Sequence, residues 1–274
     1  MRLGIFAKTF AGREPLPVLM AAREAGFETA QFNMACAGLP AMPDAIAPSL
    51  TRRIAGASTE SGVTIAAVSA TYNMIHPDPF VRAQGMRRLG VILAAAKAMG
   101  TNLVTLCTGT RDRDDQWRHH RDNDTAEAWR DLLTEMSTAI DLAESHSVDL
   151  GIEPELANVV NSAVAAWRLI DELKSPRLRI VLDPANLFEV ADAQSRRRIV
   201  DHAVDLLGDR IAMAHAKDRD AEGHFAAAGQ GVIDFRHFVQ ALRQVGFDGA
   251  LVTHGLQAGE ALQVASFLRD VVAS

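Results

Sequence analysis

The feature that most constrains the fold is a series of short apolar runs, each ending in side chains that can bind a metal ion. Four of these runs lie in the second half of the chain, at residues 151–155, 181–186, 213–218 and 251–254. They recur about every thirty residues with helical patterns between them, which is the period of a βα unit. Since parallel strands of a barrel end on one face, these polar side chains are expected to converge there.

The rest of the chain continues the same rhythm and predicts eight strands and eight helices. Strands are expected at 3–6, 28–33, 63–69, 103–107, 150–153, 179–182, 211–214 and 250–252. Helices are expected at 15–25, 42–61, 78–99, 125–146, 162–173, 193–207, 235–245 and 259–272. No Pro/Gly/Ser linker divides the chain, so we predict an α/β protein with a single (β/α)8 TIM barrel domain over residues 1–274.

Charge and composition exclude several partners. The formal net charge of -6 argues against a nucleic-acid partner, because the only basic run, Arg196-Arg197-Arg198, is typical of a solvated helix end. No apolar run approaches the roughly 20 residues that span a bilayer, which predicts no membrane partner. Cys36 and Cys107 form no zinc or disulfide pattern and the N-terminus has no signal-peptide pattern, so a cytoplasmic location is expected. The segment Gly229-Gln230-Gly231 lacks the third glycine of a dinucleotide fingerprint, so no dinucleotide-binding site is predicted.

Glu153, Asp183 and His215 offer two carboxylates and one imidazole at the ends of successive strands. This set suits one divalent ion (Mn²⁺, Mg²⁺ or Co²⁺, with Zn²⁺ as a further option) in an open coordination shell. Such an ion could bind a sugar carbonyl and stabilise the enediolate that an isomerase or epimerase forms. Each residue also has a purely structural alternative: Asp183 could cap a helix, and His215 could be a hydrogen-bonded core side chain.

With these residues the chain resembles the xylose-isomerase-like TIM-barrel superfamily, which contains sugar phosphate isomerases and epimerases, ketose 3-epimerases and relatives of AP endonuclease family 2. The resemblance covers nearly the whole chain. It is carried by Ile152-Glu153-Pro154, Leu182-Asp183-Pro184-Ala185-Asn186, His215-Ala216-Lys217-Asp218 and the segment 229–235. It implies that Glu153, Asp183 and His215 are metal ligands and that Glu153 also exchanges a proton with the substrate. It also allows a homodimer.

The chain departs from this resemblance at the last strand, where many relatives carry a glutamate and this sequence has His254. His254 is expected either to bind the metal as a neutral imidazole or to act as an acid or base. Losing one anionic ligand leaves the metal more positive, which would suit an anionic substrate. A metal-dependent lyase that decarboxylates a 3-oxo sugar acid is therefore the alternative to an isomerase or epimerase, because decarboxylation needs one base fewer. A non-catalytic sugar-binding barrel is the third hypothesis.

Residues near these strand ends are candidates for binding a small carbohydrate or sugar acid. Lys217 is a candidate catalytic residue that could orient an oxyanion, and Glu155 could hydrogen-bond a metal ligand. The polar segment 108–124 is long enough for a lid over the site. The candidates for contact with the substrate are Asn186, Arg111 and Trp117, and His76, which could instead fix its own loop.

Overall fold

The computed structural model describes all residues 1–274 and contains a closed barrel of parallel strands. Neighbouring strands around the barrel follow the order β1-β10-β7-β6-β5-β4-β3-β2. The barrel strands are β1 (Arg2–Phe6), β2 (Thr29–Phe32), β3 (Thr64–Ser69), β4 (Leu103–Leu106), β5 (Asp149–Ile152), β6 (Leu178–Leu182), β7 (Ile211–Ala216) and β10 (Ala250–Thr253). The predicted single (β/α)8 barrel is confirmed.

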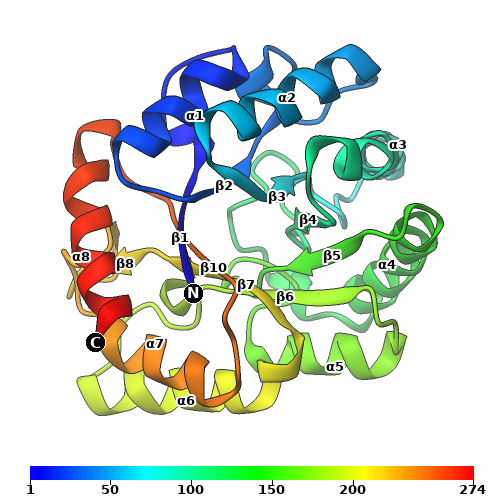
Figure 1. Cartoon of the computed structure of the whole chain (residues 1–274). Coiled ribbons are helices and arrows are strands. Elements are labelled where there is room, and N and C mark those ends of the chain that lie inside the picture. Colours follow the sequence, from blue (N-terminus) through cyan, green and yellow to red (C-terminus); the bar gives the residue numbers. More distant parts are fainter.

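Eight α-helices surround the barrel (Figure 1). They are α1 (Pro15–Glu24), α2 (Pro48–Ser61), α3 (Pro79–Ala96), α4 (Ala126–His146), α5 (Ala163–Leu173), α6 (Ala193–Leu207), α7 (Phe235–Gln244) and α8 (Ala261–Ala273). Seven short 3-10 helices occupy connections: η1 (Ala7–Thr9), η2 (Met34–Ala37), η3 (Lys97–Met99), η4 (Arg121–Asp124), η5 (Pro184–Asn186), η6 (Gly208–Arg210) and η7 (Ala258–Glu260). No helix combines the length and hydrophobicity that crossing a bilayer requires.

Two details of the predicted secondary structure are wrong. The helix expected from residue 42 begins only at Pro48, because Ala47 before this proline is extended (φ -69°, ψ 140°). The sequence prediction also missed a small antiparallel hairpin, β8 (Asp218–Arg219) with β9 (Phe225–Ala226). These strands have two residues each, too short for a periodic pattern to reveal them.

The apolar core has two parts. A large cluster of 72 buried residues fills the space between the helices and the outside of the barrel. A smaller cluster of six buried residues comes from five barrel strands: Ala67, Leu103, Val181, Met213, Ala250 and Val252. Because side chains alternate along a strand, residues two positions beyond Val181, Met213 and Val252 face the same way as these three. Those residues are Asp183, His215 and His254, so the barrel interior continues directly into the polar strand ends.

Candidate metal centre

Glu153, Asp183, His215 and His254 come together at the carboxyl ends of β5, β6, β7 and β10. Each offers one ligand atom, and these four atoms all lie within 4.8 Å of one another. Opposite ligands of one metal ion are separated by about twice the metal–ligand distance of roughly 2.0–2.3 Å. The separation and the chemistry of the donors therefore fit a single divalent ion, and these four residues would hold it.

Close contacts bind the four residues into one cluster. Nδ1 of His215 lies 3.2 Å from Oε1 of Glu153 and 3.9 Å from Oδ2 of Asp183. Nε2 of His254 lies 3.1 Å from the same Asp183 oxygen, and the two imidazole rings are 4.4 Å apart between centroids. Asp183 is fully buried, whereas the side chains of Glu153 and His254 keep about a fifth of their surface exposed (19% and 21%). The cluster therefore has a closed inner side and an open outer side.

Gln31 at the end of β2 orients His215 from the opposite wall of the barrel. Nε2 of His215 donates to Oε1 of Gln31 at 2.9 Å, while Nε2 of Gln31 donates to Oγ1 of Thr105, also at 2.9 Å. In this arrangement the amide nitrogen of Gln31 faces Thr105 and its oxygen faces the imidazole. When the ring is neutral, this bond keeps its proton on Nε2 and leaves the Nδ1 lone pair for the cluster, as a metal ligand must.

Burial and charge act in opposite directions on the titration of the cluster. Burial alone would raise the pKa of Asp183, but Lys217 and the two histidines outweigh it and hold that pKa below its ordinary value. Burial would lower the pKa of His215, yet the neighbouring Glu153 carboxylate raises it. Burial and the charge of His215 lower the pKa of His254. His254 is therefore the imidazole that stays neutral more readily.

Glu155 is a titratable group that the sequence analysis placed only as a hydrogen-bond partner of a ligand. The structure shows no such bond to its side chain; instead Glu155 lines the cavity in front of the cluster. Burial, followed by the charge of Glu153, raises the pKa of Glu155 to about 7. A carboxyl group with that pKa can both donate and accept a proton near neutral pH.

Lys217 and Asn186 complete the inner wall. Nζ of Lys217 donates to Oδ1 of Asn186 at 3.0 Å and lies 3.6 Å from Oδ2 of Asp183. Nδ2 of Asn186 donates to Oε1 of Glu153 at 2.7 Å. Asn186 and His215 both contact Oε1, whereas Oε2 of Glu153 has no hydrogen-bond partner in the chain.

Asp218 does not belong to this wall. It is fully buried and accepts hydrogen bonds from the backbone N–H groups of residues 229, 231 and 233, so it anchors the glycine-rich loop.

The cluster opens into a cavity of ≈ 390 Å³. Trp117, Asn186 and Lys217 line it. Several further lining residues come from the first half of the chain and were not predicted: Lys8, Gln31, Asn33, Ser69 and Thr71. Their positions could have indicated this role, since each lies at or just after the end of β1, β2 or β3, where the strand ends of the barrel converge.

The structure does not bring His76 and Arg111 to this cavity. Nε2 of His76 lies 2.9 Å from the carbonyl oxygen of Arg113, and its Nδ1 accepts from the backbone N–H of Asp78 at 3.0 Å. The guanidinium of Arg111 donates to Asp131 at 2.7 Å and to the carbonyl of Ile75 at 3.1 Å. Both side chains hold loops together.

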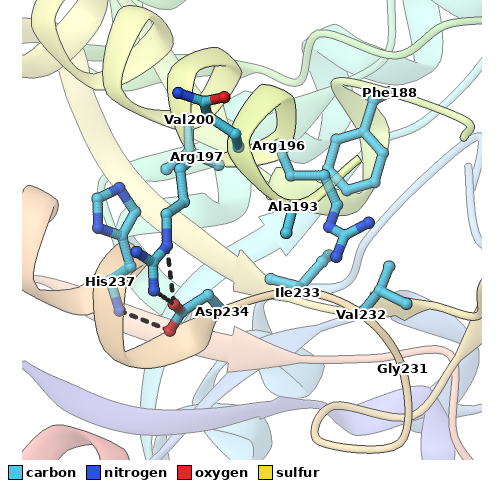
Figure 2. A pocket seen from close by; sticks show the side chains of 11 residues that line it. Phe188, Ala193, Arg196, Arg197, Val200, Gly231, Val232, Ile233, Asp234 and His237 are labelled. Carbon is cyan, nitrogen blue, oxygen red and sulfur yellow. Dashed lines mark hydrogen bonds and ion pairs between the residues drawn. The ribbon is translucent and has the colours of Figure 1, made fainter. Parts of the chain in front are cut away.

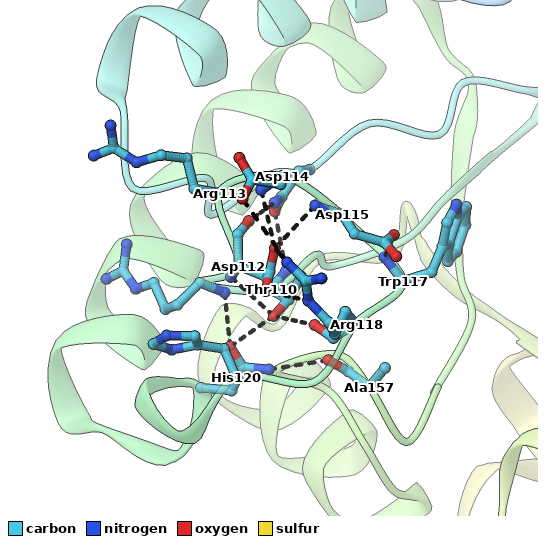
Figure 3. A network of polar contacts seen from close by, with 12 residues as sticks. Thr110, Asp112, Arg113, Asp114, Asp115, Trp117, Arg118, His120 and Ala157 are labelled. Atoms are coloured by element: carbon cyan, nitrogen blue, oxygen red, sulfur yellow. Dashed lines mark hydrogen bonds and ion pairs between the residues drawn. The ribbon is translucent and has the colours of Figure 1, made fainter.

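The segment 108–124 is tied down by its own polar contacts. Asp112 accepts from Arg118 at 2.6 and 2.8 Å (Figure 3). Oδ1 of Asn123 accepts from the backbone N–H of Arg111 at 2.7 Å. Trp117 stands at the edge of this network and is 50% exposed. The network thus carries Trp117 to the rim of the cavity.

A separate cavity of ≈ 520 Å³ lies between α6 and the start of α7 (Figure 2). The guanidinium of Arg197 lies 2.6 Å from Asp234 at its edge, and the remaining walls are largely apolar. None of the four clustered residues reaches it. The cavity at the barrel end is the stronger candidate site, because convergent titratable groups line it.

Comparison with known proteins agrees with this architecture. The family model for the xylose isomerase-like TIM barrel matches residues 19–271. Comparison with curated protein sequences gave no match.

Several solved structures have the same fold. An L-ribulose 3-epimerase is 18% identical with a TM-score of 0.76, covering 99% of this chain and 94% of its own. The IolI protein with a bound zinc atom is 17% identical with a TM-score of 0.74, covering 100% of this chain and 98% of its own. A xylose isomerase-like TIM barrel/4-hydroxyphenylpyruvate dioxygenase fusion protein is 20% identical with a TM-score of 0.73, covering 98% of this chain. The chain spans only 42% of that fusion protein.

Proposed function

The chain belongs to the xylose isomerase-like TIM barrel family, and from that membership we propose that it is a metal-dependent isomerase or epimerase acting on a keto sugar. The observation that carries this proposal is the convergence of Glu153, Asp183, His215 and His254 on one open cavity. A divalent cation held there would polarise the carbonyl of a bound keto sugar and so acidify the adjacent C–H group. The L-ribulose 3-epimerase and the zinc-bound IolI protein, which share the fold, agree with this chemistry.

The chain supplies two carboxyl groups for the proton transfers. His215 and Asn186 contact Oε1 of Glu153 and leave its other oxygen for the substrate, while the charge of His215 outweighs burial and lowers the pKa of Glu153. Glu153 is therefore an ionised base that can remove a proton from carbon. Glu155, with its pKa near 7, can return a proton to the substrate. Glu155 would thus serve as the second acid or base, in place of the glutamate that many relatives carry at the position of His254.

Three neutral or cationic side chains orient the sugar. Asn186 and Lys217 are hydrogen-bonded to each other, and Lys217 has further N–H groups for a substrate oxygen. Trp117 covers the rim of the cavity. His76 and Arg111 lie outside the set that we propose to contact the substrate. The segment 108–124, which carries Trp117, would act as the lid.

The test is exchange of substrate C–H with deuterium from solvent, measured by mass spectrometry on protein reconstituted with Mn²⁺. We expect exchange for at least one ketose, and its loss by at least a hundredfold in Glu153→Gln. Glu24→Gln, on the exposed surface of α1, is the matched control and should leave exchange unchanged. A protein that binds metal and sugar without exchange at any ketose would contradict the proposal and support a binding barrel.

Decarboxylation of a 3-oxo sugar acid is the second candidate, and one feature of the cavity favours it. Two lysines, Lys8 and Lys217, line the cavity beside the proposed metal ion, and His254 adds no negative charge. This balance suits a carboxylate substrate. Release of CO₂ from 3-oxo sugar acids, without deuterium exchange at ketoses, would identify this reaction instead.

A further inference from the structure

A third cavity, of ≈ 550 Å³, adjoins the one at the metal cluster. Trp117, Glu155 and Asn186 line both, so the two volumes form compartments of one site. Pockets for small ligands measure about 300–1,000 Å³. The inner compartment at ≈ 390 Å³ is already large enough for a single keto sugar, which leaves the outer compartment without an occupant.

Aromatic side chains form the walls of the outer compartment. Phe225 is 51% exposed and Trp117 50% exposed. Two cations lie against the Phe225 ring, with Nζ of Lys217 at 3.8 Å and the guanidinium carbon of Arg219 at 4.1 Å from the ring centroid, and about half of the side chain stays open to solvent. The pairing of Phe225 with Arg219 in the β8–β9 hairpin holds the ring in place. Phe225 is thus a fixed aromatic platform.

Polar groups lie around these rings. Arg219 is buried, and its Nε donates to the carbonyl of Ala185 at 2.6 Å while Nη1 donates to that of Gly223. Its Nη2 has no partner in the chain and remains available to a ligand. Glu189 and His119 line the same compartment. A hexose ring matches this surface, because its C–H face packs on an aromatic ring while its hydroxyls hydrogen-bond at the edge.

We propose that the substrate is a glycoside with a keto-sugar unit beside the metal cluster and a second hexose ring in the outer compartment. The second ring stacks on Phe225 and Trp117 and hydrogen-bonds to Arg219. The inference rests on the proposed function only in placing a keto sugar as the inner unit. The outer compartment itself is defined by residues that take no part in the proton transfers, apart from Glu155 on the boundary.

Calorimetry on Mn²⁺-loaded protein tests the proposal, with D-fructose and four of its glucosyl derivatives, linked at O3, O4, O5 and O6, as probes. At least one disaccharide should bind about tenfold more tightly than fructose, equivalent to roughly 1.4 kcal/mol. Phe225→Ala should abolish this gain, and Phe225→Tyr should retain it because the platform remains. Phe80→Ala, which removes a phenylalanine that is 84% exposed on α3, is the matched control.

Each alternative outcome has a definite meaning. If no disaccharide binds more tightly than fructose, or if the gain survives Phe225→Ala, the proposal is overturned. Disaccharide binding that depends on Phe225 but is never accompanied by C–H exchange overturns the proposed function and leaves the glycoside site standing.

Discussion

Gln31 and His215 are 184 residues apart in sequence, yet Oε1 of Gln31 accepts a hydrogen bond from Nε2 of His215 at 2.9 Å inside the barrel. The bond crosses the barrel from β2 to β7 and selects the ring tautomer that a metal ligand needs. Gln31 is in turn fixed by Thr105 at the end of β4. Two strands from the first half of the chain therefore orient a predicted ligand from the second half.

The first prediction concerns this bond. Gln31→Leu should weaken metal binding about 10- to 100-fold, because His215 loses the partner that fixes its tautomer and orientation. Competition with a chromogenic chelator would measure the affinity. Gln263→Ala, on the exposed surface of α8, should leave it unchanged. Equal affinities of Gln31→Leu and wild type would show that His215 does not depend on this bond.

A second prediction concerns the identity of the metal. His254→Glu replaces an imidazole with a carboxylate oxygen, and hard oxygen ligands favour Mn²⁺ and Mg²⁺, whereas imidazole suits Zn²⁺. The ratio of Mn²⁺ to Zn²⁺ affinity should therefore rise by about tenfold or more in this variant. Elemental mass spectrometry after equilibration with both ions gives the ratio, and exposed His202→Glu on α6 serves as control. An unchanged ratio would remove His254 from the proposed ligands.

Metal affinity should also depend on pH. Glu153 raises the pKa of His215 against the effect of burial, and the metal must displace the proton that the raised pKa retains. Affinity should thus fall as pH decreases through this pKa and level off above it. His254, whose pKa is lowered, should release no proton at neutral pH. Calorimetry in buffers of different ionisation enthalpy should find about one proton released per metal below the pKa of His215; affinity independent of pH would contradict this assignment.

The glycine-rich loop gives a stability prediction. A Cβ at Gly231 would lie 2.0 Å from the carbonyl oxygen of Arg219 and 2.5 Å from Oδ1 of Asp218. Gly231→Ala should therefore lower the free energy of unfolding by about 1–3 kcal/mol, since the buried anchor must shift. In Gly56→Ala, on α2, the new Cβ meets nothing within 4 Å, so stability should rise by up to about 1 kcal/mol. Urea denaturation measures both.

The contacts that hold the proposed lid in place can be tested through Asn123. This buried side chain accepts from the backbone of Arg111 and from Thr110, and it donates to the carbonyl of Ala157 at 2.9 Å. Asn123→Ala leaves the N–H of Arg111 and the carbonyl of Ala157 without a partner, at a cost of about 1–3 kcal/mol. Amide hydrogen exchange across residues 110–120 should become roughly tenfold faster or more, while α5 keeps its wild-type rates. Unchanged exchange in the segment would show that other contacts hold it.

The barrel and the candidate residues of the cluster follow from local patterns in the sequence, although His254 could be read either as a ligand or as an acid or base. The strands and helices could be predicted because their periodicity depends on the local alternation of apolar residues. Each predicted ligand lies two positions beyond an inward-facing strand residue, as Asp183 does beyond Val181. Parallel strands of a barrel then require their carboxyl ends to meet. These features are local, so a single sequence contains them.

Which polar residues face the cavity and which hold loops depends on contacts that form only in the folded barrel. His76 and Arg111 have the chemistry of substrate-binding residues, but loop contacts with Arg113 and Asp131 occupy them. The bond between Gln31 and His215 depends on the order of the strands in the barrel. The stacking of Lys217 and Arg219 on Phe225 depends on a hairpin too short to predict. Such contacts join residues distant in sequence, and their partners are set by barrel closure and loop packing rather than by periodicity.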